Sequence, residues 1–305
     1  MPRYAAAYLL VHEGRAAFVD NNTVHAVPRM LEALAAEGLG PDAVDYCIIT
    51  HVHLDHAGGS SALMKACPEA TLIAHPRAAP HAIDPSKLVK SASAVYGEEA
   101  FEKLYGVIEP IDASRVRALD DAQTLDLGGA KLSFLHTRGH ANHHFVIHVP
   151  EAKAVFTGDA FGIIYPDLAG TRGPFAFPSS SPTDFDAALA LAAVDRITEL
   201  EPEVVYPTHF GPCEDVQGVA QQLRADLRFS DQVMMHAYAS EAPDEALEQM
   251  IAPRLRARFD VRMEEHGVTR TDAHWERLAM DLELNAQGLA FVAAKKRRKD
   301  REASA

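Results

Sequence analysis

Short apolar runs alternate with amphipathic stretches in the first part of this chain. The runs Tyr8–Val11, Ala16–Val19 and Tyr46–Ile49 are rich in β-branched or aromatic residues, a pattern typical of strands. Between the second and third runs, Val24–Glu37 carries apolar residues at helical spacing and ends before Gly38, which predicts an amphipathic helix. The chain is therefore predicted to begin with two strands, a helix and a third strand.

The same alternation continues further along the chain. Additional strands are predicted at Thr71–Ala74, Thr124–Leu127, Lys131–His136, Phe145–Val149, Ala154–Asp159 and Val204–Thr208. The polar, helical stretch Asp84–Glu109 is interpreted as an insertion over one face. Phe161–Pro182 is rich in glycine and proline and is predicted to be a substrate-facing loop, and a helix is expected to begin at Thr183. From Val216 to Ala294 the pattern is almost wholly helical.

Composition and charge narrow the possible functions. The chain has 305 residues, 48% of them hydrophobic, and a formal net charge of -14, which argues against a nucleic-acid partner and favours a small-molecule substrate. Three cysteines without a CxxC pair favour the reducing cytoplasm. We expect neither a signal peptide nor a membrane span, because long apolar runs are missing from the sequence. A homodimer is left open.

Potential metal ligands are concentrated directly after the third predicted strand. The segment His51-Val52-His53-Leu54-Asp55-His56 contains four of them within six residues. Side chains two apart on an extended chain point the same way, so His51 and His53 are expected to face one point. Asp55 and His56 follow where the chain bends away, and they can face a second point nearby. Two metals could share such a site.

Later strand ends carry the same chemistry. His140, Asp159 and His209 each follow a predicted strand, and Asp20 ends the first hairpin. These residues complete two ligand sets, which are His51, His53, His140 and Asp159 for one metal and Asp55, His56, His209 and the shared Asp159 for the other. Asp20 can orient a ligating histidine through its second ring nitrogen, and an ordinary turn aspartate is the alternative. His144 is placed to support the site or to contact substrate.

With these motifs in order, the chain resembles the metallo-β-lactamase superfamily from residue 4 to about residue 215. HVHLDHAGG matches the HxHxDH signature, and FVD, TRGH, TGD and PTH, which contain Asp20, His140, Asp159 and His209, match the other four motifs. The resemblance implies an α+β fold, an αβ/βα four-layer sandwich, here with a C-terminal helical extension. We therefore predict a catalytic domain over 1–215, a helical subdomain over 216–294 that covers the site, and a disordered basic tail over 295–305.

This ligand set predicts a binuclear, metal-dependent hydrolase. Zinc suits histidine and carboxylate ligands best, and iron or manganese is also compatible. A water shared by two cations loses a proton near neutral pH, and the resulting bridging hydroxide attacks an ester-type substrate. Asp55 is predicted to orient this hydroxide while it ligates.

The residues around Asp159 help to predict the class of substrate. The resemblance to glyoxalase-II-like hydrolases favours an acyl-thioester. In lactonases of the superfamily a tyrosine closely follows the bridging aspartate, whereas here Tyr165 comes only later and remains a candidate substrate contact. Hydrolysis of another ester, lactone or lactam, a regulatory binding module, and a non-catalytic di-iron protein that binds or senses oxygen are the alternatives.

Overall fold

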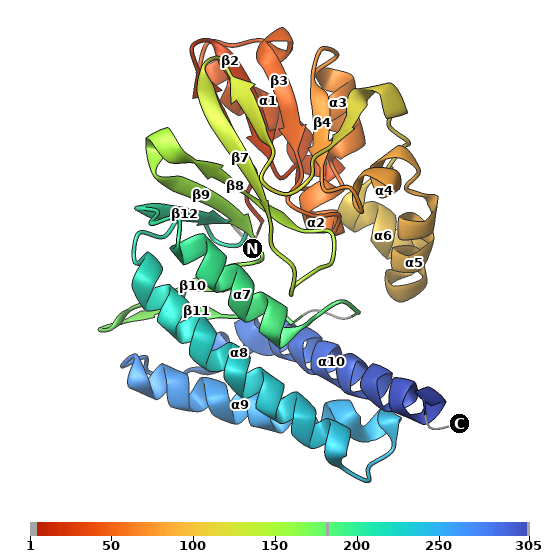
Figure 1. Ribbon diagram of the computed structural model, residues 1–305, viewed down its shortest axis with the longest axis vertical. Coiled ribbons are helices and arrows are strands. Elements are labelled where there is room, and N and C mark those ends of the chain that lie inside the picture. Colours follow the sequence, from red (N-terminus) through yellow and green to blue (C-terminus); the bar gives the residue numbers. More distant parts are fainter. Residues whose placement is uncertain (1–4, 181–182, 304–305) are drawn as a thin grey trace. The chain divides into compact units, whose positions relative to one another are not determined.

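The computed structural model describes residues 5–180 and 183–303. Within them the chain forms two compact units, and most of their helices and strands are labelled in Figure 1. The first unit contains the residues up to His136, His143–Gly158 and Val205–Gly211, and the second contains Thr137–Asn142, Asp159–Val204 and the residues from Pro212 onward. This division differs from the predicted boundary at residue 215, because segments 137–142 and 159–204 group with the C-terminal helices.

The first unit contains two five-stranded sheets. Sheet order is β1-β2-β3-β4-β5 in one and β12-β9-β8-β7-β6 in the other. In the first sheet β1 and β2 are antiparallel, and β2 to β5 pair in parallel. The strands are β1 (Tyr8–His12), β2 (Arg15–Val19), β3 (Val44–Ile48), β4 (Thr71–Ala74), β5 (Val116–Ala118), β6 (Thr124–Leu127), β7 (Ala130–His136), β8 (Phe145–Val149), β9 (Ala154–Gly158) and β12 (Val204–Pro207).

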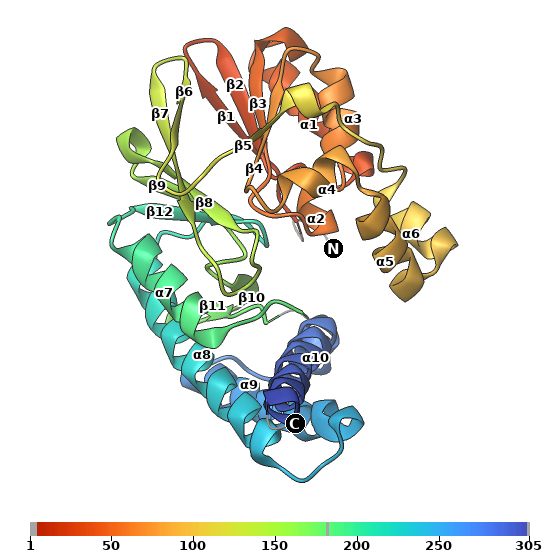
Figure 2. The same ribbon diagram turned by 45° about the vertical axis from the view of Figure 1, so that its right-hand side comes forward.

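The two sheets face each other (Figure 2). Buried apolar side chains from both sheets form one core between them. In β7, Leu132 and Phe134 are buried whereas Lys131 is exposed, which is the alternation expected of a strand with one face on a core. They pack with Ile48 and Ile73 of the opposite sheet. The predicted strands are therefore present, and β5 is an additional one that its three residues signal too weakly.

Helices cover the other face of the first sheet. In α1 (Val27–Ala36), Met30 and Leu34 are buried and lie one turn apart, so they pack against the sheet together with α3 (Ser60–Ala66). The predicted insertion is helical and forms α5 (Ser86–Tyr96) and α6 (Glu98–Tyr105). The remaining helices of this unit are α2 (Leu54–Ala57), α4 (Ala79–Ile83) and the short η1 (Val24–Ala26), η2 (Pro41–Ala43), η3 (Ala113–Arg115) and η4 (Pro150–Ala152).

The second unit contains a hairpin where the sequence predicts a loop. Strands β10 (Ile163–Gly170) and β11 (Gly173–Phe177) pair antiparallel, so the prediction of a loop over Phe161–Pro182 is wrong for most of its described residues, and residues 181 and 182 lie outside them. The segment is rich in glycine and proline, which favours a loop, but its aromatic side chains are buried. Phe175 and Phe177 pack on Phe259, with ring centroids 5.8 and 4.1 Å away, and this tertiary contact stabilises the strands.

Four helices complete the second unit. They are α7 (Ala187–Thr198), α8 (Val216–Ala239), α9 (Leu247–Glu265) and α10 (Asp272–Ala303), with η5 (Asp244–Ala246) between α8 and α9. Helix α7 begins at Ala187 rather than at Thr183, because the Asp186 side chain caps it by accepting the Leu189 amide. Helices α8, α9 and α10 pack against one another. In the parts of the chain that the structure describes, no helix combines the length and apolar character needed to cross a membrane.

The basic tail is helical rather than disordered. Helix α10 continues to Ala303, and residues 304 and 305 lie outside the described residues. Arg297 donates to the carbonyls of Ala237 and Ser240, each at 2.6 Å, and so satisfies backbone acceptors at the end of α8. It also pairs with Asp244 at 2.9 Å. These bonds anchor the last turns of α10, a contact that charge composition alone cannot reveal.

A buried ion-pair cluster joins α8 to α9. The Asp226 carboxylate is fully buried and accepts from Arg258 at 2.7 Å and from Arg262. Burial raises the pKa of Asp226, and the guanidinium groups of Arg262 and Arg258 oppose this shift. Arg262 also donates to Gln222, which accepts from the Ala176 amide of β11 at 3.0 Å. The cluster thereby connects two helices and the hairpin.

Replacing Asp226 with alanine should lower the free energy of unfolding by about 3–5 kcal/mol, because the guanidinium of Arg262 would stay buried without this carboxylate. As a control, Asp195→Ala removes a partly exposed pair with Arg224 and should cost less than about 1 kcal/mol. Urea unfolding of both variants and the wild type measures the difference. Equal losses would show that the buried cluster contributes no more than a surface pair.

Candidate metal centre

The histidine-rich motif lies where β3 leaves its sheet. His51 is fully buried, His53 is half-buried, and the Nε2 atom of His51 lies 2.9 Å from Nδ1 of His53. These two ring nitrogens therefore face one point, as side chains two apart on an extended chain should. The chain then turns into α2, the short helix that carries Asp55 and His56.

A hydroxyl fixes the orientation of the His51 ring. Thr50 Oγ1 donates to Asp20, at 2.9 Å from Oδ1, and lies 3.1 Å from His51 Nδ1. Because the hydroxyl proton is directed at the carboxylate, its oxygen accepts from Nδ1–H of His51. The lone pair of His51 is then on Nε2, the atom that faces His53.

A second group forms within the same unit from Asp55, His56 and His209. Oδ2 of Asp55 lies 3.7 Å from Nε2 of His56 and 3.6 Å from Nε2 of His209. Both histidines are buried, whereas the Asp55 side chain is 31% exposed, so this group is accessible to solvent. The three residues form a set whose ligand atoms all lie within 4.8 Å of one another.

Asp20 contacts residues of both ligand groups in the first unit, the His51–His53 pair and the Asp55–His56–His209 set, through Thr50, Thr208 and His56. Its buried carboxylate accepts from the Thr50 amide at 2.8 Å and from the Thr208 hydroxyl at 2.5 Å, and it lies 2.8 Å from Nδ1 of His56. A carboxylate accepts, so Nδ1 of His56 carries the proton and Nε2 is left to bind a cation. Asp20 has a φ of 55°, a left-handed conformation that aspartate tolerates better than most residues.

The second unit carries another pair of ligand types. Nε2 of His140 lies 3.4 Å from Oδ2 of Asp159, and both residues are buried. Nδ1 of His140 lies 3.2 Å from the carbonyl oxygen of Ser179. A carbonyl can only accept, so this bond places the proton on Nδ1 and the lone pair on Nε2, toward Asp159.

The spacing of these donor atoms fits a divalent cation. Zinc bonds nitrogen and oxygen ligands at about 2.0–2.2 Å in tetrahedral geometry, which puts neighbouring ligand atoms about 3.3–3.6 Å apart. Three of the four separations, at 3.4, 3.6 and 3.7 Å, are close to that range. The fourth, 2.9 Å between Nε2 of His51 and Nδ1 of His53, is shorter. Histidine and aspartate donors can also bind iron or manganese, so the geometry identifies a metal-binding arrangement and not the metal.

The other predicted residues lie in different surroundings. His144 is fully buried in the first unit with its ring centroid 5.0 Å from that of His51, so it packs against a candidate ligand. Tyr165 lies in β10, where its buried hydroxyl donates to Asp281 of α10 at 2.9 Å. Tyr165 therefore forms a contact between elements of the second unit.

Several supporting residues were not predicted from the sequence. Thr50 and Thr208 each hydrogen-bond to Asp20, and each directly precedes a candidate histidine ligand, so the repeated Thr-His pair is a signal that could have identified them. His143 also faces the motif, and its Nδ1 accepts from the Val52 amide at 3.4 Å. Ser179 acts through its backbone carbonyl and carries no signal in its residue type.

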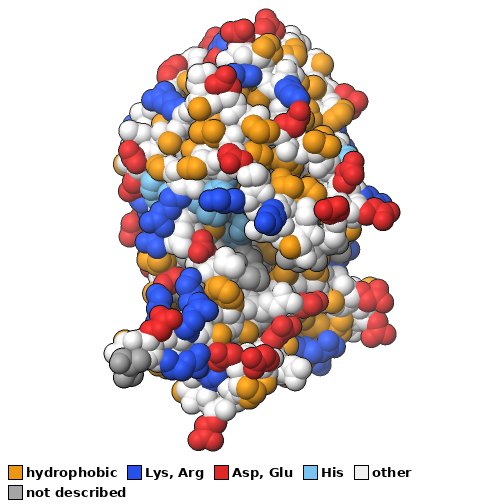
Figure 3. Space-filling model, turned by 90° about the vertical axis from the view of Figure 1, so that its right-hand side faces the viewer, with side chains coloured by type: hydrophobic (Ala, Val, Ile, Leu, Met, Phe, Trp, Pro, Cys, Tyr) orange, Lys and Arg blue, Asp and Glu red, His pale blue; other side chains and the backbone are white. Residues whose placement is uncertain are grey.

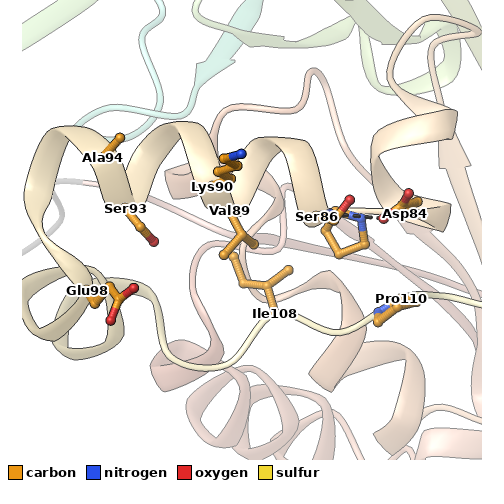
Figure 4. Close-up of a pocket in the computed structure, with 10 residues that line it drawn as sticks. Asp84, Ser86, Val89, Lys90, Ser93, Ala94, Glu98, Ile108 and Pro110 are labelled. Carbon is orange, nitrogen blue, oxygen red and sulfur yellow. Dashed lines mark hydrogen bonds between the residues drawn. The ribbon is translucent and has the colours of Figure 1, made fainter.

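The insertion shapes a pocket of its own in the first unit. A hollow of about 590 Å³ opens between α5, the start of α6 and residues 108–110 (Figure 4). It is lined by Asp84, Pro85, Ser86, Val89, Lys90, Ser93, Ala94, Glu98, Ile108 and Pro110. Two of these residues, Pro85 and Ile108, also border a small cavity that contacts Val52 and Leu54 of the histidine motif. The pocket thus adjoins the back of the motif.

Figure 3 shows one face of the molecule, on which some histidine side chains reach the surface among acidic, basic and apolar side chains.

Comparison with known proteins identifies the family. The model of the metallo-beta-lactamase superfamily matches residues 1–209, and the chain belongs to this superfamily. It is 26% identical over 213 residues to the metallo-beta-lactamase fold-containing protein ST1585 of Sulfurisphaera tokodaii, which covers 69% of this chain and 74% of that protein. The crystal structure of ST1585 matches with a TM-score of 0.63 and 22% identity, over 95% of this chain and 93% of that one. The predicted fold, with mixed sheets and a C-terminal helical region, is therefore confirmed.

More distant relatives are named as hydrolases. An atrochrysone carboxyl ACP thioesterase of Aspergillus fumigatus is 24% identical over 194 residues, 64% of this chain and 46% of that protein. A hydroxyacylglutathione hydrolase of Aeromonas hydrophila is 28% identical over 137 residues, 45% of this chain and 39% of that protein. This chain thus spans less than half the length of either relative.

Replacing Asp20 with asparagine should weaken zinc binding by about 10–100-fold, because the amide no longer provides two acceptor oxygens to orient His56 and the neighbouring threonines. Asp45→Asn, which changes a partly exposed pair between Asp45 and Arg15, is the matched control and should bind zinc like the wild type. Competition with a chromophoric chelator measures the affinities. Wild-type affinity in Asp20→Asn would contradict the orienting role.

Proposed function

We propose that this protein is a metal-dependent hydrolase whose substrate is a small acyl-thioester. The observation that carries this proposal is the set of oriented histidine and aspartate donors in a member of the metallo-β-lactamase superfamily. In each oriented case a carboxylate, hydroxyl or carbonyl holds one ring nitrogen, so that the other faces a neighbouring donor. A histidine that binds a metal needs a partner that fixes its ring orientation in this way, whereas a histidine that only packs in a core does not need one.

The proposed centre is binuclear. His51, His53 and His140 would hold one cation, and Asp55, His56 and His209 the other, with Asp159 shared between them. The order of these residues along the chain, each after a strand of the family fold, supports this assignment. Zinc is the proposed metal because histidine nitrogen dominates the donor set, and iron or manganese is the alternative.

Two bound divalent cations would supply Lewis acidity and make water a usable nucleophile near neutral pH. The protein's own contribution is orientation. Asp55 directs one carboxylate oxygen at His56 and His209 and is partly exposed, so its other oxygen could accept a hydrogen bond from the attacking water and orient it. Asp20 and Thr50 keep His56 and His51 in the required tautomers throughout.

A thiol nucleophile is a poor alternative for this chain. Cys47, Cys67 and Cys213 are all buried and free. Burial raises the pKa of each thiol, in the case of Cys67 to about 11, so the reactive thiolate is scarce at neutral pH. The same three free cysteines support the proposal of a reducing, cytoplasmic location.

The choice of a thioester rests on the distant relatives. Both the thioesterase and the hydroxyacylglutathione hydrolase are named for thioester chemistry, and the match to each includes only part of its length. The net charge of -14 further supports a small-molecule partner over nucleic acid. The insertion pocket at α5 and α6 is the proposed location for part of the substrate beyond the bond that is cleaved.

Replacing Asp159 with alanine should lower turnover by at least about 100-fold and reduce bound metal below two equivalents, because outer-shell changes alone already cost 10–100-fold in such centres. Asp231→Ala, an exposed aspartate of α8, is the control and should retain both. Metal analysis and single-substrate kinetics on the two purified variants test this expectation. Full activity in Asp159→Ala would contradict the proposal that this carboxylate is shared between the two cations.

A substrate panel separates the proposed activity from its rivals. With two equivalents of metal bound, acyl-thioesters should turn over faster than oxygen esters, lactones or β-lactams of similar size. Preferential cleavage of a lactone or lactam would replace the thioester proposal while keeping the hydrolase class. Retained iron, oxygen-dependent visible absorption and no turnover would instead show a non-catalytic oxygen-binding protein.

A further inference from the structure

Helix α10 presents two buried polar side chains one turn apart. Asp281 and Asn285 are only 6% and 3% exposed. The other buried residues of this helix are leucine, alanine and glycine. Burying polar groups costs free energy unless they are hydrogen-bonded, so each is expected to have a specific partner. The two partners, Tyr165 and Ser180, lie outside the helix, in segment 159–204 of the same unit, which begins with Asp159.

Asn285 holds the segment that contacts His140. Its Oδ1 accepts from the Ser180 amide at 2.5 Å and from the Ser180 hydroxyl at 2.7 Å, and its backbone carbonyl accepts from the same hydroxyl at 3.2 Å. Ser180 is 2% exposed. Its neighbour Ser179 offers the carbonyl that bonds Nδ1 of His140. A side chain of α10 therefore bonds the residue next to the one whose carbonyl contacts His140.

Asp281 holds the segment that follows Asp159. The Gly162 amide bonds back to the Asp159 carbonyl at 3.1 Å, and β10 begins at Ile163, directly after this turn. Two residues later the Tyr165 hydroxyl donates to Asp281. One turn of α10 therefore binds both segments that position the ligand pair of the second unit.

We propose that α10 is a positioning element for the metal site, in which Asn285 fixes His140 through Ser180 and Ser179. This inference rests on the proposed function, since it gives His140 the role of a ligand. Asn285 is a positioning residue and contacts no reacting atom. The C-terminal helix would then set metal affinity as well as contribute to folding.

The test compares Asn285→Ala with Leu289→Ala in the full chain, using Zn²⁺ as the probe. Leu289 is a fully buried α10 residue one turn further on, so its truncation damages helix packing. Asn285→Ala should weaken one of two zinc ions by about tenfold and leave the other unchanged, as loss of an outer-shell partner does. Leu289→Ala should lower the unfolding temperature without this selective loss. Chelator competition and thermal unfolding measure the two effects.

A second readout does not require metal. Hydrogen exchange of the Ser180 amide should accelerate in metal-free Asn285→Ala and remain protected in Leu289→Ala, because only the first variant loses the acceptor of that amide. If Asn285→Ala does not fold, Ser180→Ala decides the question, since it removes the hydroxyl bonds and should weaken the same zinc ion to a smaller extent.

The outcomes distinguish the two proposals. Wild-type protein that fails to bind two zinc ions would overturn the proposed binuclear centre. Wild-type protein that binds two, with unchanged affinity in the folded Asn285→Ala variant or, if that variant does not fold, in Ser180→Ala, would overturn the positioning role alone. Equal, unselective losses in Asn285→Ala and Leu289→Ala would show that α10 contributes only stability.

Discussion

The buried carboxylate of Asp20 is the interaction on which the first unit's ligand geometry depends. It accepts hydrogen bonds from Thr50 and Thr208 and lies against Nδ1 of His56, and so it joins the ends of three strands. Burying a carboxylate costs free energy unless it is hydrogen-bonded, and these donors offset that cost. The same bonds orient the rings that would bind a metal. The same set of contacts therefore stabilises the unit and orients its candidate metal ligands.

The second unit supports its ligand types in a different way. His140 is oriented by a backbone carbonyl of Ser179. The next residue, Ser180, is held by Asn285 of α10, which lies 105 residues later in the chain. A carbonyl can satisfy the ring nitrogen only if its own segment is fixed. This arrangement gives the C-terminal helices a function in site geometry, in addition to burying apolar surface. The ion-pair cluster at Asp226 keeps these helices in register with the hairpin.

Regular periodicity made much of the fold predictable from sequence. Apolar runs and alternation located every strand of the two sheets except β5, and helical spacing located α1 and the helices after Val216. Prediction failed where the stabilising contact is distant. The β10–β11 hairpin depends on Phe175 and Phe177 packing on Phe259, and the end of α10 depends on Arg297 bonding the end of α8. Neither contact leaves a local pattern, so glycine, proline and charge were misleading there.

The sequence by itself determined the types and order of the candidate ligands, because metal chemistry restricts the residues and strand ends are where they can project. It also determined the family, through motifs that occur in a fixed order. Only the tertiary structure decided which groups hold those ligands, namely Thr50, Thr208 and Asn285. Each of these bonds joins residues that are far apart in the sequence and meet only when the chain folds. The orientation of a histidine is thus a property of its neighbours in space.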